Sequence, residues 1–292
     1  MIRLINKKEN ILGDEIGYVE NWDFSKANMS NENRIHAITL VASICYQNPK
    51  ALGSESLYNR LAAESHSLPS SSFEFVPVLL DRQDFNKCYL SITGNIPTIT
   101  IHNNNPLTKF GEWIENGKYL LTNFRAVVYL FEKFGIDFRD KFNTEAECAI
   151  IAKHFSVFKY YVDLPTRAQM VRHRVNWQEL SRRYVSGKRV HFDFYISEKM
   201  KFNSVHQDGQ GQNFTLDEND FNEICVERYN QALDRGVKPE EARRCIPQSM
   251  YTTIWGAFQP TQLENYFHLR SDLHAQKEIR ATSDAMQELI GA

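Results

Sequence analysis

The chain carries a dense group of polar side chains just past its midpoint. Four arginines and one histidine fall within 12 residues, and each guanidinium keeps its charge and needs hydrogen-bond acceptors. Apolar Met170, Val171, Trp177 and Leu180 are interleaved with them, so one side of the segment is expected to pack while the other lines a cleft. We expect an anion site there, built from Gln169, Arg172, His173, Arg174, Glu179, Ser181, Arg182, Arg183 and Tyr184.

A plainer interpretation of this segment is a solvated surface helix. Glu179 and Arg183 lie four residues apart, and an i,i+4 ion pair on a helix contributes only a few tenths of a kcal/mol. Against this, a serine beside arginines at a turn offers a hydroxyl and a forked guanidinium to a phosphate group. Both interpretations stay open at the level of the residues alone.

Two further polar groups lie nearer the C-terminus. Arg270 and His274 are four residues apart, with Asn265 before them, which predicts that all three project from one helix. An exposed polar stripe would have the same spacing. Arg243 follows Glu240 and Glu241, whose position at a helix start is explained by the helix dipole without any function.

Several chemistries are not supported by the sequence. It contains no GxxxxGK[ST] loop, no GxGxxG after a strand, no GxSxG elbow and no HExxH pair. The histidines lack metal-ligand spacing, and we expect no metal site. No pair of nucleophile and base is evident, and Cys245 beside Arg244 is expected to be a packed thiol.

Composition sets the broader class. The 292 residues are 42% hydrophobic and 24% charged, with a formal net charge of -2, which is typical of a globular protein and not of a uniformly basic nucleic-acid binder. The five cysteines are scattered and include no CxxC pair, which favours a reducing compartment. The start lacks the apolar stretch of a signal peptide, and no segment approaches a membrane span. We expect a soluble, cytoplasmic protein.

The elements that position these residues are read from periodicity and turn residues. Helices are predicted over 33–46 and 54–67, strands over 73–80 and 154–164, and helical structure before Arg172 that resumes near Gln178. The tract 211–258 is expected to be two helices around a Gly/Pro break, and residues 262–290 a single final helix. Residues of about 81–150 differ in character, with a β-like stretch at 89–102, and are predicted to be an insertion or subdomain.

Taken together, these motifs resemble the flavin-dependent thymidylate synthases, the ThyX family. The family signature is RHR, seven residues and then Ser, usually followed by x-Arg-Tyr; here Arg172-His173-Arg174 is followed after six residues by SRRY. The run LRSDLHAQKEIR at 269–280 is similar to the family's LRxDxHAQxEI, and PEEARRCIPQSMYT at 239–252 to its ExARxxLPxxxYT stretch. The segment around His66 resembles GHxTPFEH. The likeness covers about half of the chain.

The resemblance implies a fold, an assembly and a reaction. The fold would be α+β, a curved antiparallel β-sheet flanked by helices, forming one catalytic domain over 1–292 with an inserted subdomain at about 81–150. The chain would form a homotetramer with active sites between subunits. It would reductively methylate dUMP to dTMP, with methylenetetrahydrofolate as carbon donor, NADPH as reductant and FAD as cofactor, and without a nucleic-acid or membrane partner.

The resemblance also implies roles for individual residues. Ser181 and Arg183 would hold the dUMP phosphate with Arg182 beside them and with Arg243 arriving from another subunit. Gln169 and Arg270 would contact the uracil, Glu179 would shape the pyrimidine pocket and Tyr184 would form its wall. Arg270 and Ser181 are the expected catalytic residues, with Arg270 stabilising the negative charge that develops on the pyrimidine. The residues expected to contact FAD are His66, Arg172, His173, Arg174, Asn265 and His274.

Two alternatives remain at this stage. The gap after Arg174 is one residue shorter than in the family, so a related protein could methylate or hydroxymethylate another pyrimidine nucleotide, UMP or dCMP. The arginine-rich segment with Trp177 and Tyr184 could instead bind single-stranded nucleic acid by phosphate contacts and stacking. The near-neutral net charge argues against this second alternative.

Overall fold

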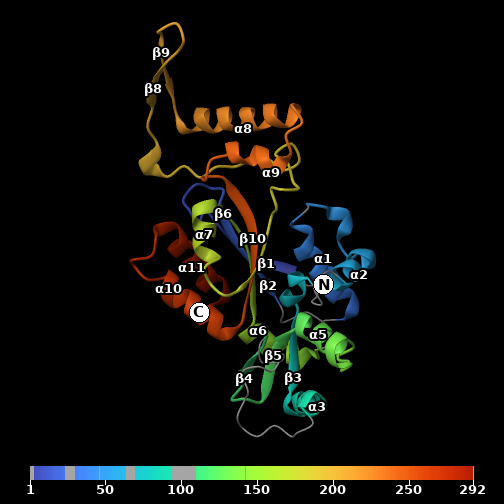
Figure 1. Cartoon of the computed structure of the whole chain (residues 1–292). Helices are drawn as coiled ribbons and strands as arrows, with labels where there is room; N and C mark the ends of the chain where they lie inside the picture. The colour runs from blue at the N-terminus through green and yellow to red at the C-terminus, as the bar shows by residue number, and fades with distance from the viewer. Residues whose placement is uncertain are drawn as a thin grey trace.

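The main sheet has five strands, all antiparallel to their neighbours. A computed structural model describes residues 3–23, 30–45, 47–63, 70–93, 110–141 and 143–291. The strand order is β1 (Arg3–Glu9), β2 (Tyr18–Asp23), β6 (Ser156–Asp163), β10 (Tyr251–Phe258) and β7 (Asn176–Glu179). β10 pairs with β6 along its whole length and with β7 from Ile254 to Ala257. Residues 176–179 and 251–258, which adjoin two of the predicted motifs, are therefore neighbouring strands of one sheet (Figure 1).

Helices cover both faces of this sheet. One face packs on α7 (Leu164–Met170), α10 (Pro260–Arg270) and α11 (Lys277–Ile290), and the other on α1 (Asn31–Ser43) and the short helix η2 (Ser71–Phe75), beside which lies α2 (Glu55–Ala63). Every residue of β10 is buried, with Ile254 in one core cluster and Trp255 in the other. The predicted antiparallel sheet flanked by helices is confirmed.

A second, three-stranded antiparallel sheet lies at the lower end of the molecule. Its order is β3 (Pro77–Asp81), β5 (Tyr119–Asn123) and β4 (Glu112–Ile114), with α3 (Arg82–Thr93), α5 (Phe124–Phe134) and α6 (Glu145–His154) around it. Its buried residues belong to the same hydrophobic cluster as α1 and Trp255. Buried Arg34 of α1 also donates to the Arg139 and Lys141 carbonyls. The predicted subdomain is thus joined to the rest of the chain through a continuous core.

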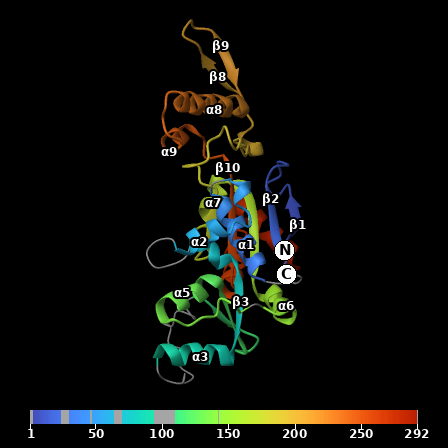
Figure 2. The same ribbon diagram turned by 90° about the vertical axis from the view of Figure 1, so that its right-hand side faces the viewer.

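The opposite end of the molecule consists of a hairpin and two helices. β8 (Ser204–Gln207) pairs with β9 (Asn213–Leu216), and α8 (Glu218–Asp234) and α9 (Pro239–Ala242) follow. The Asp217 side chain caps α8 by accepting from the Asp220 amide, and the Asp220 side chain accepts from the Asp217 amide. Figures 1 and 2 both show the hairpin extending away from the main sheet. The remaining short helices are η1 (Pro49–Ala51), η3 (Glu198–Met200) and η4 (Arg243–Cys245).

The helices predicted over 33–46 and 54–67 are confirmed as α1 and α2, apart from residues 46 and 64–67, which lie outside the described residues. The strand predicted over 154–164 is β6 and the helical structure before Arg172 is α7, but the helix predicted to resume near Gln178 is wrong. Asn176–Glu179 form strand β7, because this segment pairs with the free edge of β10. Trp177 also packs against Gly256, where a Cβ atom would lie 2.6 Å from its Cζ3. The pairing partner is 75 residues or more away in sequence, so local periodicity did not reveal it.

The prediction for the tract 211–258 is right only in its centre. Residues 213–216 are strand β9 and residues 251–258 are strand β10, while α9 has four residues. Buried β-branched and aromatic side chains favour a strand in YTTIWGAF. The predicted final helix is two helices, α10 and α11, separated at Ser271–Gln276.

In the N-terminal half, the predicted strand at 73–80 begins only at Pro77, after η2. Pro77 does lie on an edge strand, as expected, since β3 is at the edge of its sheet. The β-like stretch at 89–102 is helical through Thr93, and its remainder lies outside the described residues, as does His66.

Candidate functional site

A cavity of about 510 Å³ opens where β7, β10, α7 and η4 meet. Its side chains come from four separate stretches of sequence, which the sheet brings together. Its lining is Leu164, Arg167, Glu179, Leu180, Ser181, Arg182, Arg243, Arg244, Ile246, Met250 and Thr252. Of the predicted substrate residues, Glu179, Ser181, Arg182 and Arg243 therefore share one cavity.

The charge of this cavity is strongly positive. Four arginines line it against a single carboxylate, Glu179. Glu179 forms an ion pair with Arg167 and accepts a hydrogen bond from Thr252 Oγ1 at 3.2 Å. The remaining arginines exceed the acidic groups, so the cavity is suited to an anion such as a phosphate monoester.

Arg182 is fixed by its own chain. Its guanidinium donates to the carbonyls of Val190 at 2.7 Å and His191 at 3.0 Å, and it stacks on the Phe192 ring at 4.4 Å. Burial lowers the pKa of Arg182. Its Nε is buried and has no hydrogen-bond partner among the described residues. Arg182 therefore orders the loop that follows Ser181 while exposing part of its surface to the cavity.

Arg183 and Arg243 differ in how they relate to the cavity. Arg183 Nη2 lies 3.5 Å from Glu240 Oε2, and Arg183 is not among the cavity's lining residues. Arg243 lines the cavity within the same chain, although its expected role was to reach a neighbouring subunit. The helical Glu179–Arg183 pair does not form, because Glu179 lies on a strand and binds Arg167. Tyr184, the expected pocket wall, is 56% exposed.

Arg270 lies in a second cluster, at the C-terminal end of α10. Its Nε donates to His173 Nε2 at 2.6 Å, and its Nη2 donates to the Gln169 carbonyl at 3.1 Å. His173 is 8% exposed and its ring lies 4.7 Å from that of Tyr266. The structure thus joins the predicted residues Gln169, His173 and Arg270, which are about a hundred residues apart in sequence.

His173 is electrically neutral near pH 7. Burial, together with the adjacent Arg270 charge, lowers the pKa of His173 to about 4. A neutral imidazole has one acceptor nitrogen, and Nε2 must be that acceptor because the Arg270 guanidinium can only donate. The His173 carbonyl also accepts from Trp177 Nε1 at 3.2 Å and from the Val175 amide at 2.9 Å. These bonds fix the turn between α7 and β7.

The other residues predicted to contact FAD lie on the surface around this turn. Arg172 and Arg174 are exposed on the turn itself, and Asn265 is exposed on α10. Gln262 Nε2 of α10 donates to the Arg174 carbonyl at 2.8 Å. His274 lies in the loop after α10 and not on its helix face as predicted; its Nδ1 is 2.7 Å from Asp272 Oδ1. Two exposed guanidiniums beside an amide-bearing helix fit the phosphates of a dinucleotide.

Three polar residues of the cavity, Arg167, Arg244 and Thr252, were not predicted from the sequence. Arg244 directly follows Arg243 within the quoted motif at 239–252, whereas Arg167 is two positions before Gln169 and outside the quoted motifs. Thr252 lies on β10, which was mistaken for a helix. For Arg167 and Arg244, the sequence signal was an additional arginine within two positions of a predicted residue.

The described residues contain neither a candidate metal site nor a membrane-spanning helix. They contain no group of three or more His, Cys, Asp or Glu side chains that could hold a metal ion. Among them there is also no helix long and apolar enough to cross a membrane.

The C-terminal half of the chain matches known proteins. Residues 151–292 match the family model described as "Thymidylate synthase complementing protein". Proteins named flavin-dependent thymidylate synthase are 30% identical over 149 residues in Kosmotoga olearia and 30% over 143 residues in Thermotoga neapolitana. Each match covers 46% of this chain. The chain spans only 62% and 61% of the lengths of these two relatives.

One further relative and one solved structure complete the comparison. The flavin-dependent thymidylate synthase of Thermosipho africanus is 34% identical over 137 residues, which is 42% of this chain and 58% of that protein. The crystal structure of a UMP/dUMP methylase, PolB, from Streptomyces cacaoi bound with 5-Br UMP matches 46% of this chain and 66% of that chain. It is 22% identical, with a TM-score of 0.36.

Proposed function

We propose, from the match of residues 151–292 to the thymidylate synthase complementing protein family model, that the chain is a flavin-dependent thymidylate synthase. It converts dUMP to dTMP in the cytoplasm, with methylenetetrahydrofolate as carbon donor and NADPH as reductant. In this reaction the C5–H bond of the pyrimidine breaks and a bond to the donated carbon forms. The proton from C5 is therefore released to solvent.

The observation that carries this proposal is the arginine-lined cavity at the end of β7. A nucleoside monophosphate needs a site for a dianion, and Ser181, Arg243 and Arg244 supply one beside a carboxylate, Glu179. We assign the phosphate of dUMP to the Ser181 and Arg243 end. Arg183 can contact the phosphate only if its ion pair with Glu240 breaks. That ion pair is weak, because both side chains are exposed.

Arg270 is the residue we assign to the pyrimidine. Removing the proton from C5 places negative charge on the ring carbonyls, which a fixed guanidinium stabilises. Neutral His173 and the Gln169 carbonyl hold two of the donors of Arg270 and so fix its orientation without competing for its charge. Arg270 therefore needs little reorganisation when the charge develops.

FAD would be held by the turn between α7 and β7 and by α10. The residues we assign to it are Arg172, His173, Arg174, Asn265 and His274, with His66 outside the described residues. When bound, FAD supplies the hydride transfer that side chains cannot perform. Arg172 and Arg174 then neutralise its phosphates, and buried His173 supports the turn from beneath.

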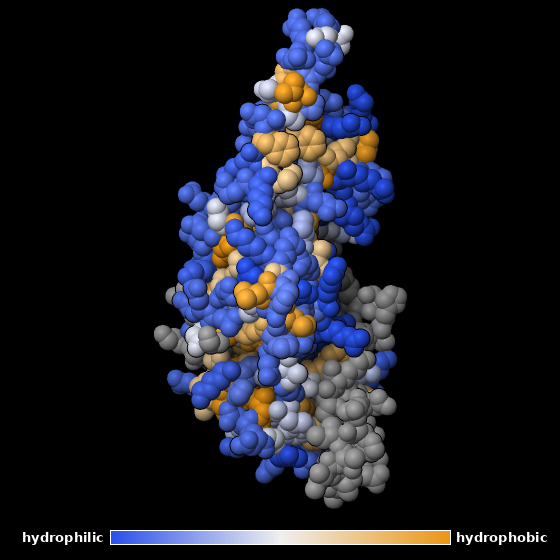
Figure 3. Space-filling view, turned by 90° about the vertical axis from the view of Figure 1, so that its left-hand side faces the viewer, coloured by the Kyte–Doolittle hydropathy of each residue, from blue (hydrophilic) through white to orange (hydrophobic). Residues whose placement is uncertain are grey.

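We also propose that the chain assembles as a homotetramer. Half of the exposed large hydrophobic side chains of the described residues lie between residues 200 and 237, at Met200, Phe202, Val205, Phe214, Phe221, Ile224 and Val237. Figure 3 shows apolar surface in the upper part of the molecule, near the hairpin. Contiguous exposed apolar surface is typical of protein interfaces.

Tritium release from C5-labelled dUMP tests the proposed reaction. The full chain is assayed with FAD, NADPH and methylenetetrahydrofolate, and labelled UMP and dCMP are run in parallel. We expect release from dUMP alone. Release only from UMP or dCMP would move the substrate, and no release from any of the three would refute the proposal.

The Arg270→Ala variant tests the assigned mechanism. We expect turnover to fall about 100-fold or more, in line with the loss of a charge-stabilising group, while flavin absorbance of the purified protein is retained. Arg235→Ala, an exposed arginine at the end of α8, is the matched control and is expected to keep full turnover. Normal turnover in Arg270→Ala would remove Arg270 from the mechanism.

A further inference from the structure

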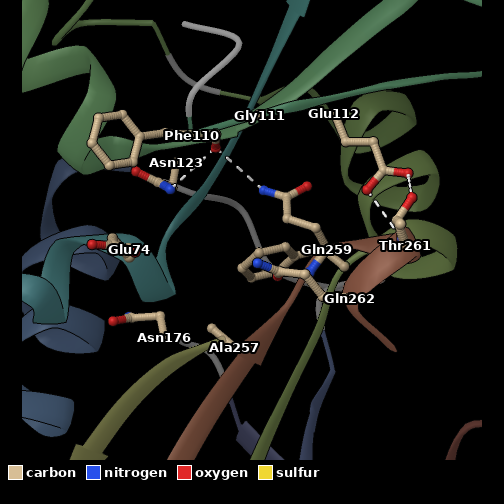
Figure 4. A pocket seen from close by; sticks show the side chains of 11 residues that line it. Glu74, Phe110, Gly111, Glu112, Asn123, Asn176, Ala257, Gln259, Thr261 and Gln262 are labelled. Atoms are coloured by element: carbon tan, nitrogen blue, oxygen red, sulfur yellow. Dashed lines mark hydrogen bonds between the residues drawn. The ribbon is translucent and has the colours of Figure 1, made fainter. Parts of the chain in front are cut away.

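Two further cavities differ in how they relate to the arginine-lined cavity. One, of about 270 Å³, lies where the three-stranded sheet meets the C-terminal half of the chain, and side-chain amides bonded to the Phe110 carbonyl brace its wall (Figure 4). It shares no residue with the arginine-lined cavity. The other, of about 440 Å³, lies beside α8 and is lined by Cys245, whose neighbours Arg244 and Ile246 line the arginine-lined cavity. This cavity beside α8 therefore adjoins the proposed phosphate site.

The short helix η4 forms part of the wall of both adjoining cavities. Its residues Arg243 and Arg244 line the arginine-lined cavity, whereas its last residue, Cys245, lines the cavity beside α8. The rest of the second lining comes from α8 and the turn after it, at Ile224, Glu227, Arg228, Gln231, Ala232, Arg235 and Val237. A change in the position of η4 thus alters both cavities.

A second cysteine, Cys225, lies on α8 near Cys245. α8 and η4 pack together, with Cα atoms of the two helices within 8 Å of one another. Cys225 is three positions before Arg228 and seven before Ala232, so these residues share one face of α8, and the latter two line the cavity together with Cys245. Burial and, after it, the adjacent Cys245 thiol raise the pKa of Cys225. The two thiols are therefore neighbours between α8 and η4.

These two cysteines differ from the other three in their accessibility. Cys88 and Cys148 are buried, and Cys45 is hydrogen-bonded to strand β7. Cys225 and Cys245 are half-buried and carry free thiols. An oxidant small enough to enter the cavity beside α8 reaches the Cys245 thiol, and redox-sensitive cysteines are typically accessible and close to a second cysteine.

We propose that Cys225 and Cys245 form a reversible disulfide that regulates the arginine-lined cavity, with hydrogen peroxide as the oxidant. The Cys245 thiolate attacks the peroxide and breaks its O–O bond, which gives a sulfenic acid and, with the thiol proton, water. The Cys225 sulfur then displaces the sulfenic hydroxyl as a second water, and the S–S bond forms. Two thiols and one peroxide thus become one disulfide and two waters, and a small dithiol restores both thiols by exchange.

The disulfide should weaken the binding of anions in the arginine-lined cavity. A disulfide requires Cα atoms about 4.4–6.8 Å apart, so it holds η4 against α8. Arg243 and Arg244 are the two residues before Cys245 and line the cavity while the thiols are free. Drawing Cys245 toward α8 moves both arginines away from an anion. The proposal rests on this positive cavity and not on turnover.

The first test asks whether these two cysteines become linked. The full chain is treated with hydrogen peroxide, digested without reductant and analysed by mass spectrometry. We expect a linked pair of peptides containing Cys225 and Cys245, lighter by two hydrogen atoms than the separate peptides, which dithiothreitol releases. Cys148→Ala, which changes a buried cysteine, is the matched control and should still form the link. No link, or links at other cysteines in its place, would overturn the proposal.

The second test measures the effect on the arginine-lined cavity. Inorganic phosphate is titrated calorimetrically into the reduced and the peroxide-treated full chain, because phosphate tests the arginines without the nucleotide assignment. We expect the reduced protein to bind phosphate about tenfold tighter, the effect of one hydrogen bond to a charged group. Arg243→Ala should lose this binding, which assigns it to the cavity.

Cysteine variants separate the disulfide from other effects of peroxide. Cys225→Ser should bind phosphate equally well before and after the treatment, and Cys245→Ser replaces it if circular dichroism shows that Cys225→Ser does not fold. Equal binding, or no binding, of phosphate by the reduced and the linked protein would overturn the proposal. A loss of binding on peroxide treatment of a folded cysteine variant would also overturn it. Neither test measures turnover, so failure of the tritium-release assay and failure of this proposal are separate outcomes.

Discussion

At the scale of single residues, some arginines of the anion cavity are bonded within the protein, and others keep hydrogen-bond donors for an anion. Arg182 is held by two backbone carbonyls and Arg167 by Glu179, whereas Arg243 donates only to the Glu240 carbonyl through Nε. The first two therefore shape the cavity, and Arg243 retains most of its donors for an anion.

Ser181→Ala tests the phosphate end of the cavity. The Ser181 hydroxyl lines the cavity, and a hydrogen bond from it to a charged phosphate is worth about 1.5–3 kcal/mol. We expect dUMP to bind about 10- to 100-fold more weakly in equilibrium titration. Ser186→Ala, whose side chain is outside the cavity, should bind dUMP normally. Unchanged binding by Ser181→Ala would place the phosphate elsewhere.

His173 should make the stability of the protein depend on pH. Its pKa is about 4 in the folded chain and about 6.5 when unfolded, so below pH 6.5 the unfolded state takes up a proton that the folded state does not. The stability present above pH 6.5 is therefore lost as the pH falls toward 4, by about 2 kcal/mol at pH 5.

Urea unfolding at pH 7 and pH 5 measures this loss. His173→Gln retains an acceptor for Arg270 but does not titrate, so its stability should fall by about 2 kcal/mol less between the two pH values. An equal fall in both proteins would show that His173 titrates normally in the folded state.

The sequence predicted part of the residue grouping and none of the contacts. The family resemblance placed Ser181, Arg243 and Arg270 in one substrate site; Ser181 and Arg243 do line one cavity, but Arg270 lies in a separate cluster with His173 and Gln169. The partners of Arg182 and Arg183 depend on backbone carbonyls and on Glu240, which only the folded loop brings close.

At the scale of elements, the pairing of β7 with β10 positions both predicted sites. β7 carries Glu179 to the anion cavity, and the turn before it carries His173 to Arg270. Strand β6 was predictable from its run of β-branched and aromatic residues, which only Lys159 interrupts. β7 has only four residues and is a strand because β10 offers an edge, which is tertiary information.

Gly256→Ala should weaken this pairing. A Cβ atom at Gly256 would lie 2.6 Å from Trp177 Cζ3 and 2.9 Å from Phe258 Cε2, so the Trp177 ring must move. Overpacking of this kind costs about 1–3 kcal/mol. Urea denaturation measures the loss. Gly209→Ala, where a Cβ atom meets nothing within 4 Å, should leave stability nearly unchanged.

At the scale of the whole molecule, the chain is continuous in its core. The lower sheet, α1 and the central strand β10 share one hydrophobic cluster, so the segment predicted as an insertion is packed against the C-terminal half. Sequence motifs could not show this, because the contacts join apolar residues with no distinctive spacing.

The hairpin β8–β9 has a consequence for how the chain could be divided. Its tip, Asp208–Gln212, is exposed and extends beyond α8, while β6 and β7 precede it in sequence and β10 follows it. A protease site inserted between Gly209 and Gly211 would thus cut the polypeptide into two pieces, and the second piece would contribute strand β10 between β6 and β7 of the first. After cleavage, the pieces should elute together in gel filtration and part only in denaturant; separate elution would show that the central strand is held by chain connectivity. The five-stranded sheet would then be an interleaved heterodimer that can be assembled from two genes.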